Sequence, residues 1–332
     1  MKAKTIILHI GPHKTGTTYI QKYLFLNRKI LEEYGIYYPI PKCLNEKVGH
    51  FGHHDILSNI DYYIESSSVH NIILLSSETI STFKNEQLET LLDSFSRHNI
   101  KKIKILAFIR NPFYRLKSLY VESVKWGDTK TFPHFIIEHL SKPFQSEALN
   151  PSIIFDKFSS LIGKENIILI DYDYFFKNEN ILNPVFEVIN VPLDKIYLKK
   201  ERVNKSLDEI KVEIIRILNF LAKEDKLLKF NNVREVFLQY IGNDNTNFKV
   251  VFNKLNSEAN KYKAEINIGD FYLKLIKNNF IKEWENNIYK NIISDWNTNK
   301  TFYFIEEGFG FKNNYILEKM YNTFIKPKIN NK

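Results

Sequence analysis

The sequence has a single cysteine, Cys43, among 332 residues, and one thiol cannot form an internal disulfide. This composition favours a reducing compartment, and we expect a cytoplasmic protein. No run of about 18 uncharged apolar residues is present, so no membrane-spanning helix is predicted. The apolar stretch near the N-terminus is too short for a secretory signal peptide and runs straight into a glycine loop.

Internal repeats, low-complexity segments and Gly/Ser- or Pro-rich linkers are also absent from the sequence. The hydrophobic content of 44% is enough for a large core. We predict one domain over residues 1–332, with an α/β core over 1–200 and a mostly helical extension over 201–332. The net charge of +9 is spread over scattered lysines, and no basic arm is present. This distribution predicts a solvated surface and no nucleic-acid partner.

A glycine loop near the N-terminus lacks the lysine that an ATP-binding P-loop requires. It reads Gly11-Pro12-His13-Lys14-Thr15-Gly16-Thr17-Thr18. A P-loop has the form G-x-x-x-x-G-K-[ST], with lysine directly after the second glycine. Gly11 and Gly16 keep that spacing, but position 17 is threonine and the lysine is Lys14. We therefore predict phosphate binding without triphosphate hydrolysis, with a nucleotide kinase as the alternative.

Four short apolar runs, which alternate with helical patterns, predict the buried strands of a parallel sheet. They cover residues 5–10, 72–75, 103–109 and 167–170, with helices expected near 20–34 and 85–97 and from Pro112 onward. The alternation predicts a P-loop-like three-layer α/β/α fold. Ligands bind at the carboxyl ends of the strands in such sheets.

The chain beyond residue 205 has a mostly helical pattern. Apolar residues recur on one helical face from Leu207 to Leu221. Further helices are expected over 231–290, and a last helix near 313–325 follows a break at Gly308 and Gly310. This half is expected to frame a second substrate.

The glycine loop carries several groups that bind anions. Backbone N–H groups after Gly11 and at the start of the next helix form an anion nest, which the helix dipole reinforces. Thr15, Thr17 and Thr18 add hydroxyl donors, and Lys14 adds a positive charge. The alternative is a glycine turn with an incidental lysine.

The segment after the third predicted strand reads Arg110-Asn111-Pro112, followed by Arg115 and Ser118. Arg110 closes the strand, so its guanidinium is expected to point into the ligand crevice. Ser118 lies about two turns into the following helix. An arginine and a serine hydroxyl meeting there would bind a second phosphate, apart from the loop.

In these two segments the chain resembles the sulfotransferases that use 3′-phosphoadenosine 5′-phosphosulfate (PAPS). Their first motif, P-K-(T/S)-G-(T/S)-(T/S), matches the stretch from Pro12 to Thr18 with His13 inserted, and their second, Arg-(Asn/Asp)-Pro, then Arg, then Ser, matches Arg110 to Ser118. The resemblance implies that Lys14 stabilises the leaving oxygen. The donor-binding residues that it implies are Gly11, His13, Lys14, Thr15, Gly16, Thr17, Thr18, Arg110 and Ser118.

The resemblance also bears on the acceptor. The stretch from Arg202 to Leu207 is similar to an Arg-x-Asn-x-Ser-Leu segment of bacterial glycan-type members, which implies a carbohydrate or glycolipid acceptor. The Arg-Lys-Gly segment of the cytosolic members is absent, and Asn299, Lys300 and Gly308 are candidates only by position. Nothing in the sequence indicates an oligomeric state.

Two residues are candidates for the general base that takes the acceptor's proton. Glu78 follows the second predicted strand, as the base does in the heparan-type enzymes that the chain resembles. His54, in the histidine-rich stretch from Gly49 to Asp55, is the alternative by analogy with the aryl and steroid enzymes. The same histidines could suggest zinc, but without cysteines or a set of carboxylates beside them no metal site is predicted. We expect Glu78 to lie nearer the transferred group.

Tyr172 follows the fourth predicted strand. We expect its side chain to pack within the protein, with a contact to the acceptor as the alternative.

Overall fold

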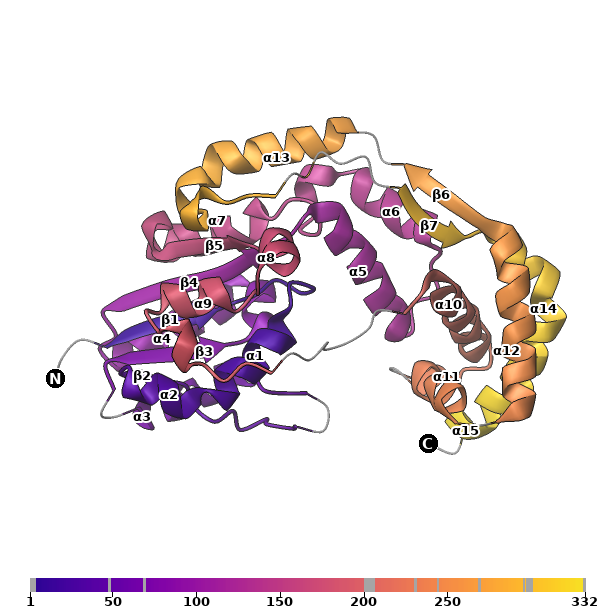
Figure 1. Ribbon diagram of the computed structural model, residues 1–332, viewed down its shortest axis with the longest axis horizontal. Coiled ribbons are helices and arrows are strands. Elements are labelled where there is room, and N and C mark those ends of the chain that lie inside the picture. The colour runs from indigo at the N-terminus through magenta and orange to yellow at the C-terminus, as the bar shows by residue number, and fades with distance from the viewer. Residues whose placement is uncertain are drawn as a thin grey trace. The chain divides into compact units, whose positions relative to one another are not determined.

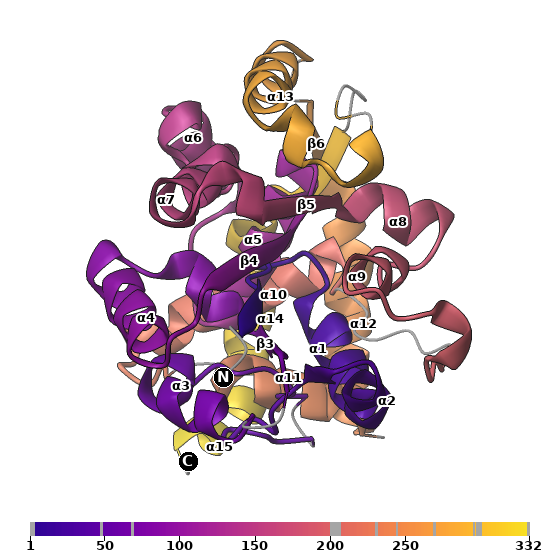
Figure 2. The same ribbon diagram turned by 90° about the vertical axis from the view of Figure 1, so that its left-hand side faces the viewer.

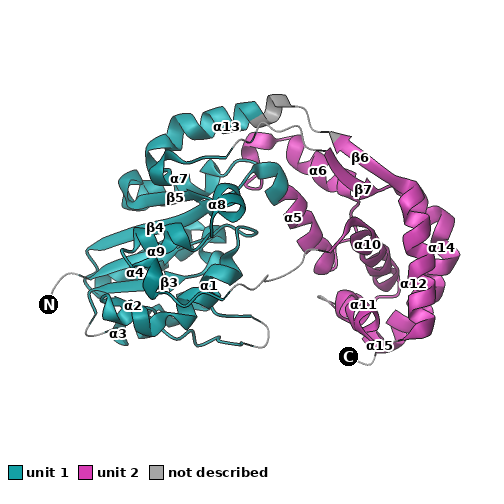
Figure 3. Ribbon diagram, in the orientation of Figure 1, with its two compact units in different colours: residues 1–115, 149–203, 274–296 teal, residues 116–148, 204–273, 297–332 magenta. Residues whose placement is uncertain are grey.

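The computed structural model describes residues 4–46, 49–67, 70–199, 207–229, 232–243, 245–267, 270–294, 296 and 301–330. The chain forms two compact units, shown in different colours in Figure 3. The first unit comprises residues 1–115, 149–203 and 274–296, and the second comprises 116–148, 204–273 and 297–332.

The two units interleave along the sequence, so their boundaries differ from the division expected at residue 200. Long-range hydrogen bonds explain the difference. In the second unit, the Asn219 amide donates to the backbone carbonyls of Val124 and Asp128. In the first unit, the Asn287 amide donates to the carbonyls of Lys164 and Ile167. Each segment therefore packs with residues far from it in sequence.

The first unit contains a five-stranded parallel sheet (Figure 1). Its strand order is β2-β3-β1-β4-β5, and β1 at the centre pairs with both β3 and β4. The four predicted strands are confirmed, and β2 is an addition. The strands are β1 (Thr5–His9), β2 (Ile36–Tyr37), β3 (Ile72–Ser76), β4 (Lys102–Ile109) and β5 (Ile167–Asp171).

Helices cover both faces of this sheet (Figure 2). Successive strand residues point to opposite faces. Ile7 belongs to the core cluster formed with α1 and α9, whereas Leu8 lines a small cavity with residues of α4 and α7. The predicted three-layer α/β/α fold is therefore confirmed. The helices of this unit are α1 (Thr17–Leu26), α2 (Arg28–Glu33), α3 (Ile56–Glu65), α4 (Asn85–Arg97), α7 (Ser152–Ile162), α8 (Tyr172–Asn178), α9 (Asn183–Val188) and the greater part of α13 (Asp270–Trp284).

The single helix expected over 20–34 is wrong, because the chain breaks at Asn27 between α1 and α2. The buried Asn27 side chain donates to the carbonyl of Tyr23 and accepts from the N–H of Tyr197, at 2.8 and 2.7 Å. An asparagine that satisfies distant backbone groups competes with the helix ladder at that point. The helix expected over 85–97 is confirmed as α4, and Pro112 begins α5 (Pro112–Lys125) as predicted.

The second unit is mostly helical, as expected for the C-terminal half, but it also holds a two-stranded antiparallel sheet that the sequence analysis did not predict. Its strands are β6 (Lys263–Asn267) and β7 (Thr301–Ile305). The described helices include α6 (Phe132–Leu140), α10 (Glu209–Glu224), α11 (Asn232–Gly242), α12 (Thr246–Ala259), α14 (Gly308–Met320) and α15 (Lys326–Asn330), with a π-helical turn over Tyr321–Ile325.

The break expected at Gly308 and Gly310 is also wrong, because both glycines lie in the first turn of α14. A Cβ atom at Gly310 would lie only 3.3 Å from Cδ1 of Ile217 on α10. Glycine therefore permits a close approach of two packed helices here.

Candidate active site

The glycine loop connects β1 to α1 at the carboxyl edge of the central strand, as the sequence predicted. Gly16 is the N-cap of α1 and lies in the left-handed region at φ 79°. As a glycine it offers no side-chain acceptor to the N–H groups of the first turn. Lys14 also has a left-handed backbone, at φ 72°. For a residue other than glycine this conformation costs about 1–2 kcal/mol, so the surrounding contacts must hold it.

Two loop threonines have different hydrogen-bond partners. The Thr15 hydroxyl donates to the carbonyl of Pro12 at 2.6 Å, so this side chain stabilises the loop itself. The Thr17 hydroxyl, on the first residue of α1, donates to a carboxylate oxygen of Glu78. Thr18 is half-buried, and its methyl group faces Gly49. The loop therefore offers α1 backbone N–H groups and the Lys14 charge as the anion-binding elements.

Arg110 lies beside this loop. Its Nη1 donates to the carbonyl of Lys14 at 2.8 Å, across 96 residues of sequence. Its Nε lies 3.5 Å from Oδ1 of Asp173, and Oδ2 of the same carboxylate accepts from the N–H of Asn111 at 2.6 Å. The contact to Lys14 stabilises the left-handed backbone of the loop. The two sequence motifs, 96 residues apart, thus meet at one edge of the sheet.

Tyr172 forms a wall next to the loop. The guanidinium of Arg110 lies 5.0 Å from the centre of the Tyr172 ring, and Phe176 stacks on the same tyrosine at 5.4 Å. A Cβ atom at Gly16 would lie 2.8 Å from the Tyr172 ring. The Tyr172 side chain therefore packs against neighbouring residues of the protein, as first expected. Burial raises the pKa of the adjacent Asp173, and its contacts with the Asn111 N–H and Arg110 oppose that rise.

Glu78 begins a short 3₁₀ helix (Glu78–Thr82) directly after β3, and its side chain is 23% exposed. Nδ1 of His13 lies 3.9 Å from its carboxylate. Burial lowers the pKa of His54, the negative charge of Glu78 opposes this, and His50 adds to the lowering. The His50 and His54 rings meet edge to face at 5.6 Å. Both base candidates therefore belong to one cluster beside the loop.

The third member of the histidine-rich stretch, His53, has a structural role. It is fully buried, its Nε2 lies 3.0 Å from the carbonyl of Pro39, and its Nδ1 accepts from the N–H of Ser76 at 3.1 Å. Burial lowers its pKa to about 4, so the ring is neutral at pH 7. His53 anchors its loop to β3.

His9 is a site residue that the sequence analysis missed. It ends β1 inside an otherwise apolar run, and that single polar position was the available signal. The ring is fully buried, its Nδ1 lies 2.7 Å from the hydroxyl of Ser76, and burial lowers its pKa to about 4. Its Nε2, 3.2 Å from a Cβ built at Gly11, has no hydrogen-bond partner within the described ranges.

The remaining residues of the second motif, Arg115 and Ser118, lie on α5. Ser118 lies on the part of α5 that belongs to the second unit. Arg115 is buried near the start of that helix. The segment from Arg202 to Ser206, together with Asn299 and Lys300, lies outside the described residues.

The described part of the chain has neither a metal-binding cluster nor a membrane-spanning helix. Among these residues, no group of three or more His, Cys, Asp and Glu side chains is arranged to hold a metal ion. No described helix combines the length and apolar character that crossing a bilayer requires.

Comparison with known proteins gives little beyond the geometry. No protein-family model matches the chain, and no curated protein matches it significantly. Among solved structures, a sulfotransferase from Alicyclobacillus acidocaldarius is similar over 67% of this chain and 93% of its own, with 15% sequence identity and a TM-score of 0.39. A similarity at this level supports no conclusion about activity.

Proposed function

We propose that this protein is a sulfotransferase that moves the sulfuryl group of PAPS to a hydroxyl or amine of a carbohydrate or glycolipid acceptor. The observation that carries the proposal is the hydrogen bond from Arg110 to the Lys14 carbonyl at 2.8 Å. It joins the two motifs through which the sequence resembles PAPS-dependent enzymes. The single cysteine suits a reducing compartment, and a cytoplasmic location is part of the proposal.

The loop has the features that a bound phosphosulfate needs. A Cβ atom at Gly11 would lie 2.2 Å from the Thr17 methyl group, so only glycine allows this close backbone approach. The first turn of α1 has no side-chain cap, and its N–H groups suit an anionic oxygen. Lys14 and Arg110 supply positive charge next to it. These donors fit the 5′-phosphosulfate and the 3′-phosphate of PAPS, with Ser118 as a further candidate for the latter.

Bound PAPS would supply the activated sulfuryl group, and the chemistry of the chain's own residues follows from charge. As the sulfur–oxygen bond breaks, negative charge develops on the departing phosphate oxygen, where the Lys14 ammonium stabilises it. The acceptor oxygen forms the new bond to sulfur and gives its proton to a general base. We assign this base to Glu78, with His54 of the same cluster as the alternative.

Donor binding tests the proposal. We expect the purified protein to bind adenosine 3′,5′-diphosphate with a dissociation constant in the low micromolar range or tighter, as measured by titration calorimetry. Lys14→Ala and Arg110→Ala should each weaken this binding by at least about tenfold, because each removes a charged contact. Arg97→Ala is the matched control, since Arg97 is an exposed arginine of the same unit on α4.

Two results would overturn the proposal. One is a titration in which adenosine 3′,5′-diphosphate does not bind the wild-type protein. The other is magnesium-dependent ATP binding in its place, which would favour a nucleotide kinase or related phosphotransferase.

A further inference from the structure

The side chain of Thr17 lies between two parts of the candidate active site, the anion-binding loop and the candidate base. Thr17 is the first residue of α1, so it belongs to the helical turn that we assign to the anion. In the structure its hydroxyl donates to Oε2 of Glu78. A hydroxyl carries one proton and donates one hydrogen bond at a time. While this proton points to Glu78, the hydroxyl cannot donate to a bound anion.

Packing fixes the position of the Thr17 hydroxyl oxygen. The residue is only 4% exposed. Its methyl group faces Gly11 so closely that a Cβ atom built there would lie 2.2 Å from it. A change of rotamer would move this methyl group out of its packed position, so the hydroxyl proton can turn while the oxygen stays in place.

The Glu78 carboxylate has a neighbour at each oxygen. Oε2 accepts the Thr17 proton, and Nδ1 of His13 lies 3.9 Å from Oε1. Because His13 belongs to the glycine loop, Glu78 stays beside the loop when it loses the contact with Thr17. The Glu78 side chain is 23% exposed, so an acceptor can reach the carboxylate from solvent.

A phosphosulfate bound on the loop competes with Glu78 for the Thr17 proton. Both are anionic acceptors, so one charge-assisted hydrogen bond replaces another of the same kind. The O–H···O bond to Glu78 breaks, a bond to the bound anion forms, and no proton is transferred. The carboxylate and the anion then repel each other, which turns Glu78 away from Thr17. A ligand shifts such a balanced exchange easily, because the two states differ little in free energy.

We propose that donor binding releases Glu78 by taking over the hydroxyl proton of Thr17. In the free protein Thr17 holds the carboxylate, and in the donor complex the carboxylate is open to the acceptor. Thr17 thereby couples the two substrates, and the acceptor's proton is taken only after the donor is in place. The inference rests on the proposed function, because it takes the anion to be the phosphosulfate of PAPS.

A double-mutant cycle tests the exchange, with adenosine 3′,5′-diphosphate as the probe and titration calorimetry as the measurement. Glu78→Met removes the competing acceptor together with its negative charge, so the probe should bind more tightly. Thr17→Val keeps the branched shape beside Gly11 but has no hydroxyl, so only the charge effect of Glu78→Met remains in that background. We expect the gain in affinity from Glu78→Met to be at least about threefold larger in the wild-type background than in the Thr17→Val background.

Thr15→Val is the matched control, because the Thr15 hydroxyl donates to the carbonyl of Pro12 within the loop. In this background Glu78→Met should give the same gain as in the wild-type background. A crystal structure of the wild-type complex provides a second measurement that needs no variant. It should show Thr17 Oγ bonded to the 5′-phosphate and the Glu78 carboxylate turned away from Thr17.

The outcomes separate this inference from the proposed function. Equal gains in the wild-type and Thr17→Val backgrounds overturn the inference but leave the proposed function intact, because the nucleotide still binds. A complex in which Thr17 still donates to Glu78 overturns it in the same way. A wild-type protein that does not bind the nucleotide overturns the proposed function, and this inference with it.

Discussion

The hydroxyl of Thr17, the first residue of α1, donates a hydrogen bond to the carboxylate of Glu78, which begins the 3₁₀ helix after β3. The two residues are 61 positions apart in sequence. The contact places the candidate base directly against the helix N-terminus that follows the glycine loop. Since His13 and His54 approach the same carboxylate, base and loop form one electrostatic unit.

This arrangement leads to a prediction about the base. Glu78→Gln keeps the shape and a hydrogen-bond acceptor for Thr17 but cannot take a proton at neutral pH. We expect kcat for sulfuryl transfer from PAPS to fall by about 10²–10⁴-fold, with little change in adenosine 3′,5′-diphosphate binding. Release of adenosine 3′,5′-diphosphate with a glycan acceptor chosen from a panel measures the rate. His54→Ala is the comparison, and a larger loss in that variant than in Glu78→Gln would reassign the base to His54.

A second prediction concerns the close approach of the loop to α1. Gly11→Ala would place a Cβ atom 2.2 Å from the Thr17 methyl group, so the loop or the helix must shift. We expect adenosine 3′,5′-diphosphate to bind at least about tenfold more weakly, because misplaced N–H groups lose their hydrogen bonds to the phosphate. Gly242→Ala, where a new Cβ meets nothing within 4 Å, should bind as wild type does. Equal affinities of the two variants for adenosine 3′,5′-diphosphate would contradict the claim that the loop has no room for a side chain at position 11.

The buried His53 predicts how stability depends on pH. Its pKa is about 4 in the folded protein and near 6.5 when unfolded, so the unfolded chain binds the extra proton between these values. The free energy of unfolding should therefore be unaffected by this group above pH 6.5 and fall by about 3 kcal/mol as the pH drops from 6.5 to 4. Urea unfolding across this range measures the slope.

A His53→Gln variant provides the check on that slope. It should be less stable at pH 7, since its contacts with Pro39 and Ser76 change, but its stability should depend less on pH. Thr90→Ala, at an exposed position on α4 that does not titrate, is the control and should keep the wild-type slope. A slope unchanged in His53→Gln would show that other groups cause the acid sensitivity.

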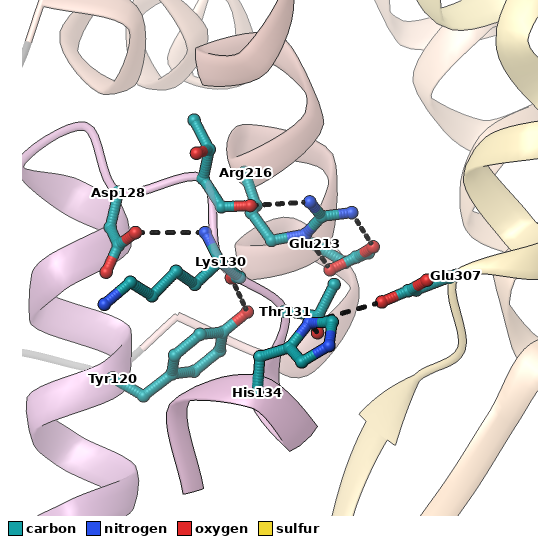
Figure 4. Close-up of polar contacts among 9 residues, drawn as sticks. Tyr120, Asp128, Lys130, Thr131, His134, Glu213, Arg216 and Glu307 are labelled. Atoms are coloured by element: carbon teal, nitrogen blue, oxygen red, sulfur yellow. Dashed lines mark hydrogen bonds and ion pairs between the residues drawn. The ribbon is translucent and has the colours of Figure 1, made fainter. Parts of the chain in front are cut away.

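A fourth prediction concerns the buried ion pair between Arg216 and Glu213 on α10 (Figure 4). Arg216→Met removes both hydrogen bonds that Arg216 donates to the Glu213 carboxylate, and burial already raises the pKa of that carboxyl despite the arginine. We expect a loss of about 3–5 kcal/mol in the free energy of unfolding, because a buried charge without its partner is costly. Lys211→Met breaks a more exposed pair with Asp208 on the same helix and should cost less than about 1 kcal/mol. Denaturant titrations of both variants measure the two losses in the free energy of unfolding. A loss below about 1 kcal/mol for Arg216→Met would contradict the claim that the buried pair stabilises the fold.

Much of the first unit could be predicted because its signals are local. The strand before Gly11, the helix over 85–97 and the start of α5 at Pro112 each follow from apolar periodicity or from the backbone limits of glycine and proline. The break at Asn27 could not, because it depends on hydrogen bonds to Tyr197, which is 170 residues away. The pairing of β6 with β7 likewise joins segments that are distant in sequence. The residue pattern of one segment does not indicate that the other is its partner strand.

The sequence by itself determined the glycine loop, the alternation of strands and helices, and the chemical types at the strand ends, because these depend on neighbouring residues. Only the tertiary structure decided which distant groups meet. It brought Arg110 to the Lys14 carbonyl, Thr17 to Glu78, and the Asn219 amide to the carbonyls of Val124 and Asp128. Contacts of this kind arise from packing between elements far apart in the chain, and no local propensity encodes them.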